Sequence, residues 1–250
     1  VTGVQTCALP IYIDPMLVHE RLPTISKMRI AARQQQIVRV DREVLEPLGS
    51  DELAQVEKQV RAMLPELDAI VLEDYGKGFI TQALIDTLVP LANAAGKLIT
   101  ADPNPRNPLN WHGVSLVKPN RLEAFAAAGI EDRHRPGDPT QDPDLQTVGA
   151  RLLAKWNVPH VLITLGEQGM ILFSADPNAK PHHIPTRARE VYDVSGAGDT
   201  AIALLTLALA AGLSIHDAAE IANHASGIVV GKLGTATLTP EELLAAFAEE

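Results

Sequence analysis

The sequence predicts an α/β protein in which helices cover both faces of a mainly parallel sheet, with a small antiparallel flap beside it. Three observations support this prediction. From residue 51 onward, segments with a helical period alternate with short apolar segments. The 250 residues are enough for one large domain, and the 46% hydrophobic content can fill its core. We expect no second independent domain.

The alternating region contains the following predicted elements in chain order. They are a helix from residue 51 capped by Ser50, a strand at 69–72, a helix at 81–95, strands at 97–100 and 114–117, helices at 121–128 and 144–156, and strands at 160–164, 171–174 and 182–185. Three helices then close the domain. The first is the strongly apolar segment 201–213, and the last begins at Thr239-Pro240 with a capping box.

Residues 22–42 interrupt the alternation and predict a small antiparallel flap, or lid, outside the main sheet. Val38 and Val40 fall on one face of its second half, whereas Arg39 and Asp41 fall on the other. The segment is unusually basic for a chain with a net charge of −10, through Lys27, Arg29, Arg33 and Arg39. Such a run fits either a solvated strand face or a lid that brings cations over an anionic substrate.

Composition excludes several classes of protein. A net charge of −10 argues against a general nucleic-acid or anionic-membrane surface, because both need clustered basic residues. No apolar run reaches the roughly 18 residues of a membrane span, and no signal-peptide pattern opens the chain. We therefore expect a cytoplasmic protein.

Residues 1–11, VTGVQTCALPI, fit no structural period and resemble a translated sequencing adapter. The natural chain is then expected to start near Tyr12. Cys7, the only cysteine, lies in this segment, so the rest has no thiol for a disulfide, a metal site or nucleophilic catalysis. The alternative is a genuine N-terminus without regular structure.

The segment 193–200, DVSGAGDT, joins a turn of small residues to the apolar helix at 201–213. Gly196, Ala197 and Gly198 are expected to bind an anion, because free N–H groups and the positive end of the helix dipole point there. A carboxylate beside a bound anion is best explained as a general base for a hydroxyl that attacks phosphorus, which assigns that role to Asp199. A glycine-rich N-cap with an ordinary capping aspartate is the alternative.

Polar or glycine-containing motifs follow four of the predicted strands, where ligands of open α/β sheets bind. They are Glu73 to Gly78, Asp102 to Arg106, Lys118 to Glu123, and Thr164 to Gly169. Each motif alone is common in turns and helix starts. Their occurrence together with the Gly-Ala-Gly-Asp turn indicates one site.

DVSGAGDT, Asn-x-x-Glu at 120–123 and Thr-Leu-Gly-Glu-Gln-Gly at 164–169 together resemble the ribokinase-like carbohydrate kinases, or PfkB family, over about residues 20–250. The resemblance implies that Asp199 is the catalytic base and that residues 196–198 form the anion hole. It implies ATP and Mg²⁺ as cofactors, with Glu123 binding Mg²⁺ through water, and leaves open a monovalent cation near Asp193. The implied ATP and Mg²⁺ ligands are Asn120, Glu123, Thr164, Gly166, Gly169 and Asn223, the last on a helix that borders the adenine.

Within this family, the lid and the segments 74–78 and 229–235 resemble the D-glycero-β-D-manno-heptose 7-phosphate kinases. The implied reaction transfers the γ-phosphate of ATP to the anomeric hydroxyl, giving the 1,7-bisphosphate for ADP-heptose and lipopolysaccharide core synthesis. Cations of the lid would pair with the 7-phosphate. The implied partners are the phosphorylated sugar, ATP and a second copy bound through the lid. Expected substrate-binding residues are Lys27, Arg29, Arg33, Asp74, Lys77, Asp102, Asn104 and Arg106.

The chain also departs from this pattern. The segment 102–106, DPNPR, is closer to fructokinase-like members, so another PfkB kinase of fructokinase or ribokinase type is an alternative. An inactive sugar- or nucleotide-binding module is an alternative of another class, against which the retained Asp199 argues. A dinucleotide-binding Rossmann enzyme is disfavoured because no Gly-x-Gly-x-x-Gly follows an early strand.

The resemblance also bears on domain limits. Residues 12–250 are expected to form a kinase domain that lacks its N-terminal part, including a first strand and sugar-binding motifs. Exposed apolar surface and unpaired strand edges then predict poor solubility or inactivity. Whether a nucleotidyltransferase domain follows Glu250 is left open.

Overall fold

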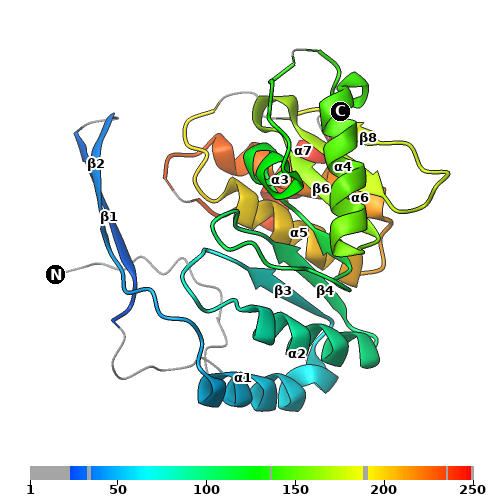
Figure 1. The fold of residues 1–250 in the computed structure, drawn as a ribbon. Coiled ribbons are helices and arrows are strands. Elements are labelled where there is room, and N and C mark those ends of the chain that lie inside the picture. Colours follow the sequence, from blue (N-terminus) through cyan, green and yellow to red (C-terminus); the bar gives the residue numbers. More distant parts are fainter. Residues whose placement is uncertain (1–22, 33–34, 136, 188–190, 235, 249–250) are drawn as a thin grey trace.

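A six-stranded sheet forms the centre of the protein (Figure 1). The structure is a computed structural model, and it describes residues 23–32, 35–135, 137–187, 191–234 and 236–248. Neighbouring strands from β3 to β6 are parallel, and β7 is antiparallel to both of its neighbours, which confirms the mainly parallel sheet. In spatial order the strands are β3 (Ala69–Glu73), β4 (Leu98–Asp102), β5 (Leu116–Val117), β6 (His160–Thr164), β7 (Met170–Ser174) and β8 (His182–Ile184).

Helices cover both faces of the sheet, as predicted. Alternate residues of β6 show the two faces, because Val161 and Ile163 belong to one apolar core and Leu162 to the other. The first core is closed by α1 (Ser50–Met63), α2 (Gln82–Ala94), α3 (Arg121–Ala128) and α4 (Pro143–Trp156). The second is closed by α5 (Ala197–Ala210) and α6 (Ile215–Val230), and α7 (Pro240–Ala248) packs on α6. None of the described helices has the length and apolar character needed to span a membrane.

Several element ends differ from the prediction, and two of them have a clear local cause. The N-cap of α1 is Gly49 rather than Ser50, because the carboxylate of Glu52 accepts the Gly49 N–H at 2.6 Å and Ser50 enters the first turn. Strand β5 begins at Leu116 rather than at Val114, because the Val114 N–H donates to Trp111 within a turn. The short β5 still places the residues after Val117 at the edge where the other parallel strands end.

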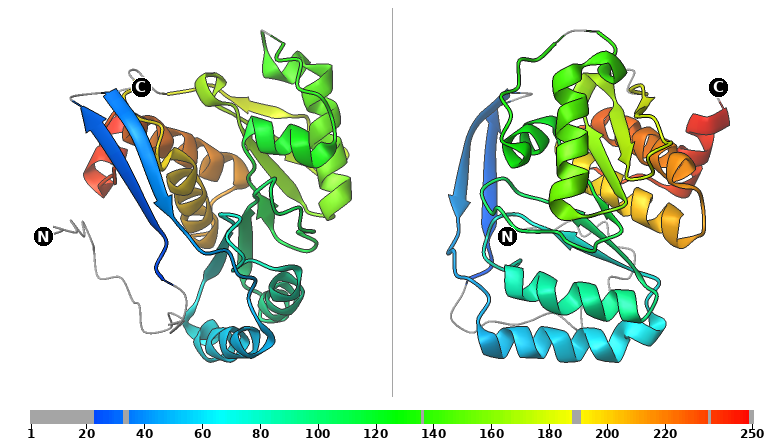
Figure 2. Two further views of the ribbon diagram at one scale, coloured as in Figure 1. Left: turned by 60° about the vertical axis from the view of Figure 1, so that its left-hand side comes forward. Right: turned by 45° about the vertical axis from the view of Figure 1, so that its right-hand side comes forward.

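The predicted lid is a separate two-stranded antiparallel sheet of β1 (Ser26–Ala32) and β2 (Gln35–Arg42). It stands beside the main body, and the two views in Figure 2 show it from other sides. Met28 pairs with Val40 and Ile30 pairs with Val38, so one face of the lid is apolar. Their exposed fractions are 63%, 52%, 44% and 44% in that order. Residues 1–11 and Arg33 lie outside the described residues.

Candidate active site

The N-terminus of α5 provides a place for an anion. Gly196 is the N-cap of α5, with a φ of 85° that favours glycine, and the helix begins at Ala197 rather than at residue 201. Within the described part of the chain, the backbone N–H groups of Gly198 and Asp199 donate to no protein acceptor. They are the free first-turn donors that bind phosphate at helix N-termini, so the turn fits the predicted anion hole.

The Asp199 side chain is exposed at this turn and contacts the end of β3. Its Oδ2 accepts a hydrogen bond of 3.3 Å from the Tyr75 hydroxyl. Burial and the Asp199 charge raise the Tyr75 pKa to about 12. Tyr75 therefore stays protonated and keeps its donor role at physiological pH.

Three carboxylates converge on the same place from the ends of β3 and β4 and from α5. One oxygen each of Glu73, Asp102 and Asp199 lies within 4.8 Å of the others. Burial, followed by repulsion from Asp102 and Asp199, raises the Glu73 pKa to about 7. Burial also raises the pKa of Asp102. Such a group of carboxylates needs a proton or a cation to relieve the repulsion, and hard oxygen donors suit Mg²⁺.

Lys118 supplies one cation to this group. It follows β5, is 2% exposed, and places Nζ 2.7 Å from Oδ2 of Asp102. Its charge lowers the pKa values of Glu73 and Glu123, in opposition to their burial. Lys118 opens the predicted motif Lys118 to Glu123 but was not among the predicted site residues, although its place directly before Pro119-Asn120 at a strand end was a signal for it.

Asn120 and Glu123 form the predicted start of α3 as a reciprocal capping box. Asn120 Oδ1 accepts the Glu123 N–H at 2.9 Å, and Glu123 Oε2 accepts the Asn120 N–H at 2.8 Å. Asn120 also bridges to Thr164 at the end of β6, which joins two of the predicted motifs. Burial raises the pKa of Glu123. The capping box therefore holds both side chains at the carboxyl edge of the sheet.

The next motif, Thr164 to Gly169, forms a tight turn between β6 and β7. Gly166 and Gly169 have φ values of 60° and 84°. A Cβ on Gly169 would collide with the backbone oxygen of Ile184, so only glycine fits there. On the other side, Asn223 of α6 is 3% exposed and donates from Nδ2 to Pro185 O at 2.7 Å. The β6–β7 turn and α6 both line one cavity.

Two adjoining cavities collect most of the predicted site residues. The first, of about 510 Å³, is lined by the ATP candidates Thr164, Gly166, Gly169 and Asn223, by Ala197 and Gly198, and by apolar side chains that include Met170, Val191 and Val230. The second, of about 580 Å³, is lined by Asp74, Asp102, Asn104, Asn120, Glu123 and Asp199 together with Glu73, Tyr75 and Lys118. Both cavities include Thr164, Gly166, Val194 and Gly198, so the anion-binding turn lies where they meet.

The remaining substrate candidates differ in their placement. Lys27 of the lid lies 5.9 Å from the ring centre of Tyr75, which is one of the residues lining the second cavity. Asp74 is buried and accepts hydrogen bonds from Gly76 and Asn107. Lys77 pairs with Glu43 and, like Arg106, lines neither cavity. Arg29 lies on β1, and Arg33 is outside the described residues.

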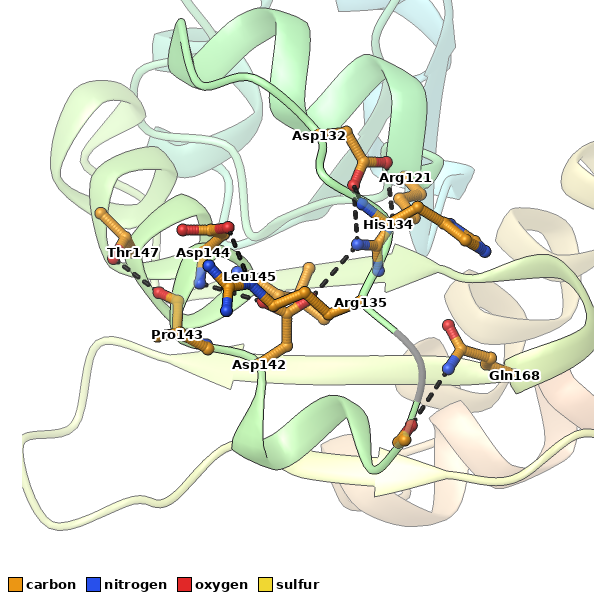
Figure 3. A network of polar contacts seen from close by, with 11 residues as sticks. Arg121, Asp132, His134, Arg135, Asp142, Pro143, Asp144, Leu145, Thr147 and Gln168 are labelled. Atoms are coloured by element: carbon orange, nitrogen blue, oxygen red, sulfur yellow. Dashed lines mark hydrogen bonds and ion pairs between the residues drawn. The ribbon is translucent and has the colours of Figure 1, made fainter.

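A polar network beside Asn120 fixes the start of α3 (Figure 3). Arg121 donates to both oxygens of Asp132, at 2.8 and 2.7 Å, and to Asp142 at 3.2 Å. Asp142 is 6% exposed and is also the N-cap of α4. The network thus joins α3 to α4 directly behind the capping box.

Comparison with known proteins agrees with this arrangement. The model of the family described as pfkB family carbohydrate kinase matches residues 11–242. "Bifunctional protein HldE" of Desulfatibacillum aliphaticivorans is 36% identical over 97% of this chain and 48% of its own length. The same-named protein of Shewanella sp. strain ANA-3 is 42% identical over 90% of this chain and 44% of its own length. The chain spans about half the length of these curated relatives.

Solved structures show the same fold. Arabidopsis thaliana ribokinase complexed with ribose and ATP superposes with a TM-score of 0.63 at 21% identity, covering 80% of this chain and 60% of the ribokinase. Phosphofructokinase-2 from Escherichia coli in complex with potassium gives 0.66 at 19% identity, covering 85% and 66%. The sheet, the lid, the motifs at the strand ends and the family match lead to one conclusion: this chain belongs to the pfkB family of carbohydrate kinases.

Proposed function

We propose that this chain transfers the γ-phosphate of ATP to the anomeric hydroxyl of D-glycero-β-D-manno-heptose 7-phosphate, giving the 1,7-bisphosphate. Kinase chemistry rests on one observation above all, the exposed Asp199 carboxylate beside the free N–H groups of the α5 first turn. The sugar assignment rests on the resemblance of the lid and of segments 74–78 and 229–235 to heptose 7-phosphate kinases, and on relatives named bifunctional protein HldE.

In this reaction Asp199 accepts the proton of the attacking hydroxyl, so that the sugar oxygen can form its bond to the γ-phosphorus. The bond from that phosphorus to the bridging oxygen of ADP breaks as the new bond forms. The N–H groups of Gly198 and Asp199 donate to the non-bridging oxygens and stabilise their charge. Tyr75 holds the Asp199 carboxylate through its hydroxyl.

The nucleotide is assigned to the 510 Å³ cavity, with its base against the apolar side chains and Asn223. Its phosphates would then reach Gly198, where the two cavities meet. Glu123 is proposed to hold Mg²⁺ through water, and Glu73 and Asp102 offer further oxygens nearby. When bound, Mg²⁺ neutralises phosphate charge. Phosphofructokinase-2 from Escherichia coli was solved in complex with potassium, and a potassium titration of the rate would show whether this chain uses a monovalent cation.

The sugar phosphate is assigned to the 580 Å³ cavity, beside Asp102 and Asn104. Lys27 approaches this cavity from the polar face of the lid and is proposed to pair with the 7-phosphate. The second candidate function is phosphorylation of a neutral sugar, which the resemblance of segment 102–106 to fructokinase-like members favours.

We also propose a homodimer formed through the lid. Lys27 points toward Tyr75, so the opposite lid face, which carries Met28, Ile30, Val38 and Val40, points away from the site. Their large exposed fractions fit burial against the same face of a second copy. Light scattering of Met28→Lys/Val40→Lys should show a monomer where the parent chain is a dimer; equal masses would reject this interface.

Residues 12–250 are proposed to be a kinase domain without its N-terminal part. Strand β3 is an edge of the sheet, and its Val71 is 38% exposed on the face that α5 covers. The activity test therefore uses both this chain and the chain preceded by the N-terminal region of the Shewanella relative. We expect the extended chain to be the more active form.

The deciding test is ATP-dependent phosphorylation of heptose 7-phosphate, fructose and ribose by the extended chain. Heptose 7-phosphate should have the highest kcat/KM, and faster turnover of a neutral sugar would overturn the substrate assignment. Asp199→Asn should lower kcat by several orders of magnitude and leave ATP affinity nearly unchanged. An unchanged kcat would remove Asp199 as the base, whereas no turnover of any of the three sugars would favour a binding module.

A further inference from the structure

We propose that Lys118 is a further catalytic residue, which binds the transferring phosphoryl group, and that Asp102 positions it. This inference rests on the proposed kinase function. Lys118 directly follows β5, and its backbone N–H donates to Ala101 O at 2.9 Å. The side chain is 2% exposed and lines the 580 Å³ cavity. The stem is therefore held by protein, and the ammonium group is the part available to a ligand.

The ammonium group lies next to the anion-binding turn. A Cβ placed on Gly198 would be 3.5 Å from Lys118 Nζ and 4.0 Å from Asp102 Oδ2. Glycine leaves this space open, and the free N–H groups of Gly198 and Asp199 belong to the same turn. A phosphoryl group over the turn would be within reach of both the backbone donors and the ammonium.

The charges also favour an anion at this point. A buried ammonium beside the positive end of α5 is repelled by the helix dipole, and Asp102 at 2.7 Å offsets that repulsion. A purely structural ion pair would gain nothing from lying against the free end of a helix. If the Lys118–Asp102 pair presents its ammonium group to a phosphate, its position beside the N-terminus of α5 is explained.

During transfer, the Lys118 ammonium donates a hydrogen bond to a non-bridging oxygen of the γ-phosphoryl group. The proton of the sugar hydroxyl goes to Asp199. The sugar oxygen gains the bond to phosphorus, and ADP leaves with the electrons of the broken bond. Lys118 thus contacts the one phosphate that ATP has and ADP lacks.

This difference supplies the test. Calorimetry would compare Mg²⁺ complexes of ADP and of the non-hydrolysable analogue AMP-PNP, for the parent chain and for Lys118→Met, Lys118→Arg and Lys58→Met. Lys58 is exposed on α1 and serves as the matched control. Lys118→Met should weaken AMP-PNP binding by about 10- to 100-fold, the loss of one charge-assisted hydrogen bond, and change ADP binding by less than about twofold. Lys118→Arg should retain part of the preference, and Lys58→Met all of it.

Equal loss of both nucleotides, or of neither, would overturn the assignment of Lys118. If Lys118→Met leaves Asp102 unpaired and unfolds, the double variant Lys118→Met/Asp102→Asn removes both charges, and its AMP-PNP preference decides the question. A parent chain that binds neither nucleotide would overturn the proposed function and this inference together. A parent chain that binds both, with a preference unaffected by Lys118, would overturn this inference alone.

Discussion

The Tyr75 hydroxyl lies 3.3 Å from Oδ2 of Asp199, although 124 positions separate the two residues in the sequence. The contact joins the end of β3 to the start of α5 across the carboxyl edge of the sheet. Tyr75 follows β3, and Glu73 is the last residue of that strand, so the contact links the proposed base to the end of β3. The same strand end thus supports the base and contributes to the carboxylate group around it.

Tyr75→Phe should lower kcat by about three- to tenfold, because a hydrogen bond to a charged group at a partly exposed site contributes on the order of 1 kcal/mol. Steady-state kinetics of the extended chain would measure it. ATP affinity should stay the same, since Tyr75 lines the second cavity and not the nucleotide cavity. A variant with unchanged kcat would show that Asp199 does not depend on this contact.

Glu73 makes stability depend on pH. Its pKa rises from 4.5 to about 7 through burial first and then through repulsion from Asp102 and Asp199. Between pH 4.5 and about 7 the folded state holds a proton that the unfolded chain has lost, so the free energy of unfolding falls as pH rises through this range. Above pH 7 the loss is complete and stays constant. Glu73→Gln should therefore raise the melting temperature more at pH 8 than at pH 5.

The matched control for this prediction is Glu66→Gln. Glu66 is an exposed glutamate that precedes β3 in the sequence. Its effect should be small and equal at both pH values. Thermal unfolding without Mg²⁺ measures both variants. A Glu73→Gln effect that is the same at pH 5 and pH 8 would show that this carboxyl does not titrate abnormally.

Gly169→Ala should destabilise the protein and weaken nucleotide binding. The added Cβ meets the Ile184 backbone oxygen, and φ is 84°. Gly129→Ala, at a φ of 64° with open space around its Cβ, carries the backbone strain alone and should cost about 1 kcal/mol. Denaturant unfolding should show a loss at Gly169 that exceeds this by about 2 kcal/mol or more. Equal losses would mean that the β6–β7 turn can move away from Ile184.

Arg121→Met should lower the free energy of unfolding by about 2–4 kcal/mol, because it leaves the buried Asp142 without its cation. It should also raise the KM for ATP, since Arg121 follows Asn120 at the start of α3. Arg135→Met is the control, because the Arg135–Asp144 pair is exposed and should contribute less than about 1 kcal/mol. Similar losses for both variants in chemical denaturation would contradict a special role for the Arg121 network.

Local signals predicted most of the fold. Asn120 caps α3 with its own side chain at the predicted Asn-x-x-Glu motif, and alternation in residues 38–41 predicted the lid strand. The predicted cap of α1 was wrong because the helix could start at either Ser50 or Gly49. The hydrogen bond from the Gly49 N–H to the Glu52 carboxylate makes Gly49 the N-cap. The start of β5 was wrong because apolar character alone does not show which residues hydrogen-bond to a neighbouring strand.

The candidate site was predicted as motifs and not as a set of contacts. The position of Asp199 after Gly-Ala-Gly, and of Asn120 and Glu123 after a strand, follows from short-range spacing. Lys118 and Glu73 open two of the predicted motifs, but short-range spacing did not mark them as site residues, because their importance comes from neighbours on other strands. Lys77 and Arg106 matched motifs of sugar-binding residues, yet the fold places neither along the two cavities.

By itself, the sequence determined the class of fold, because helix caps, glycine turns and strand alternation depend on near neighbours in the chain. Its short motifs carried the resemblance to the family and marked the residues proposed to surround the phosphoryl group. Only the tertiary structure decided which charges meet. Lys118 and Asp102 lie at the ends of adjacent strands and pair at 2.7 Å. Gly198 belongs to α5, far along the chain, yet a Cβ placed on it would lie 3.5 Å from Lys118 Nζ and 4.0 Å from Asp102 Oδ2. Parallel strands end at one edge, and electrostatic energy depends on distance through space rather than along the chain.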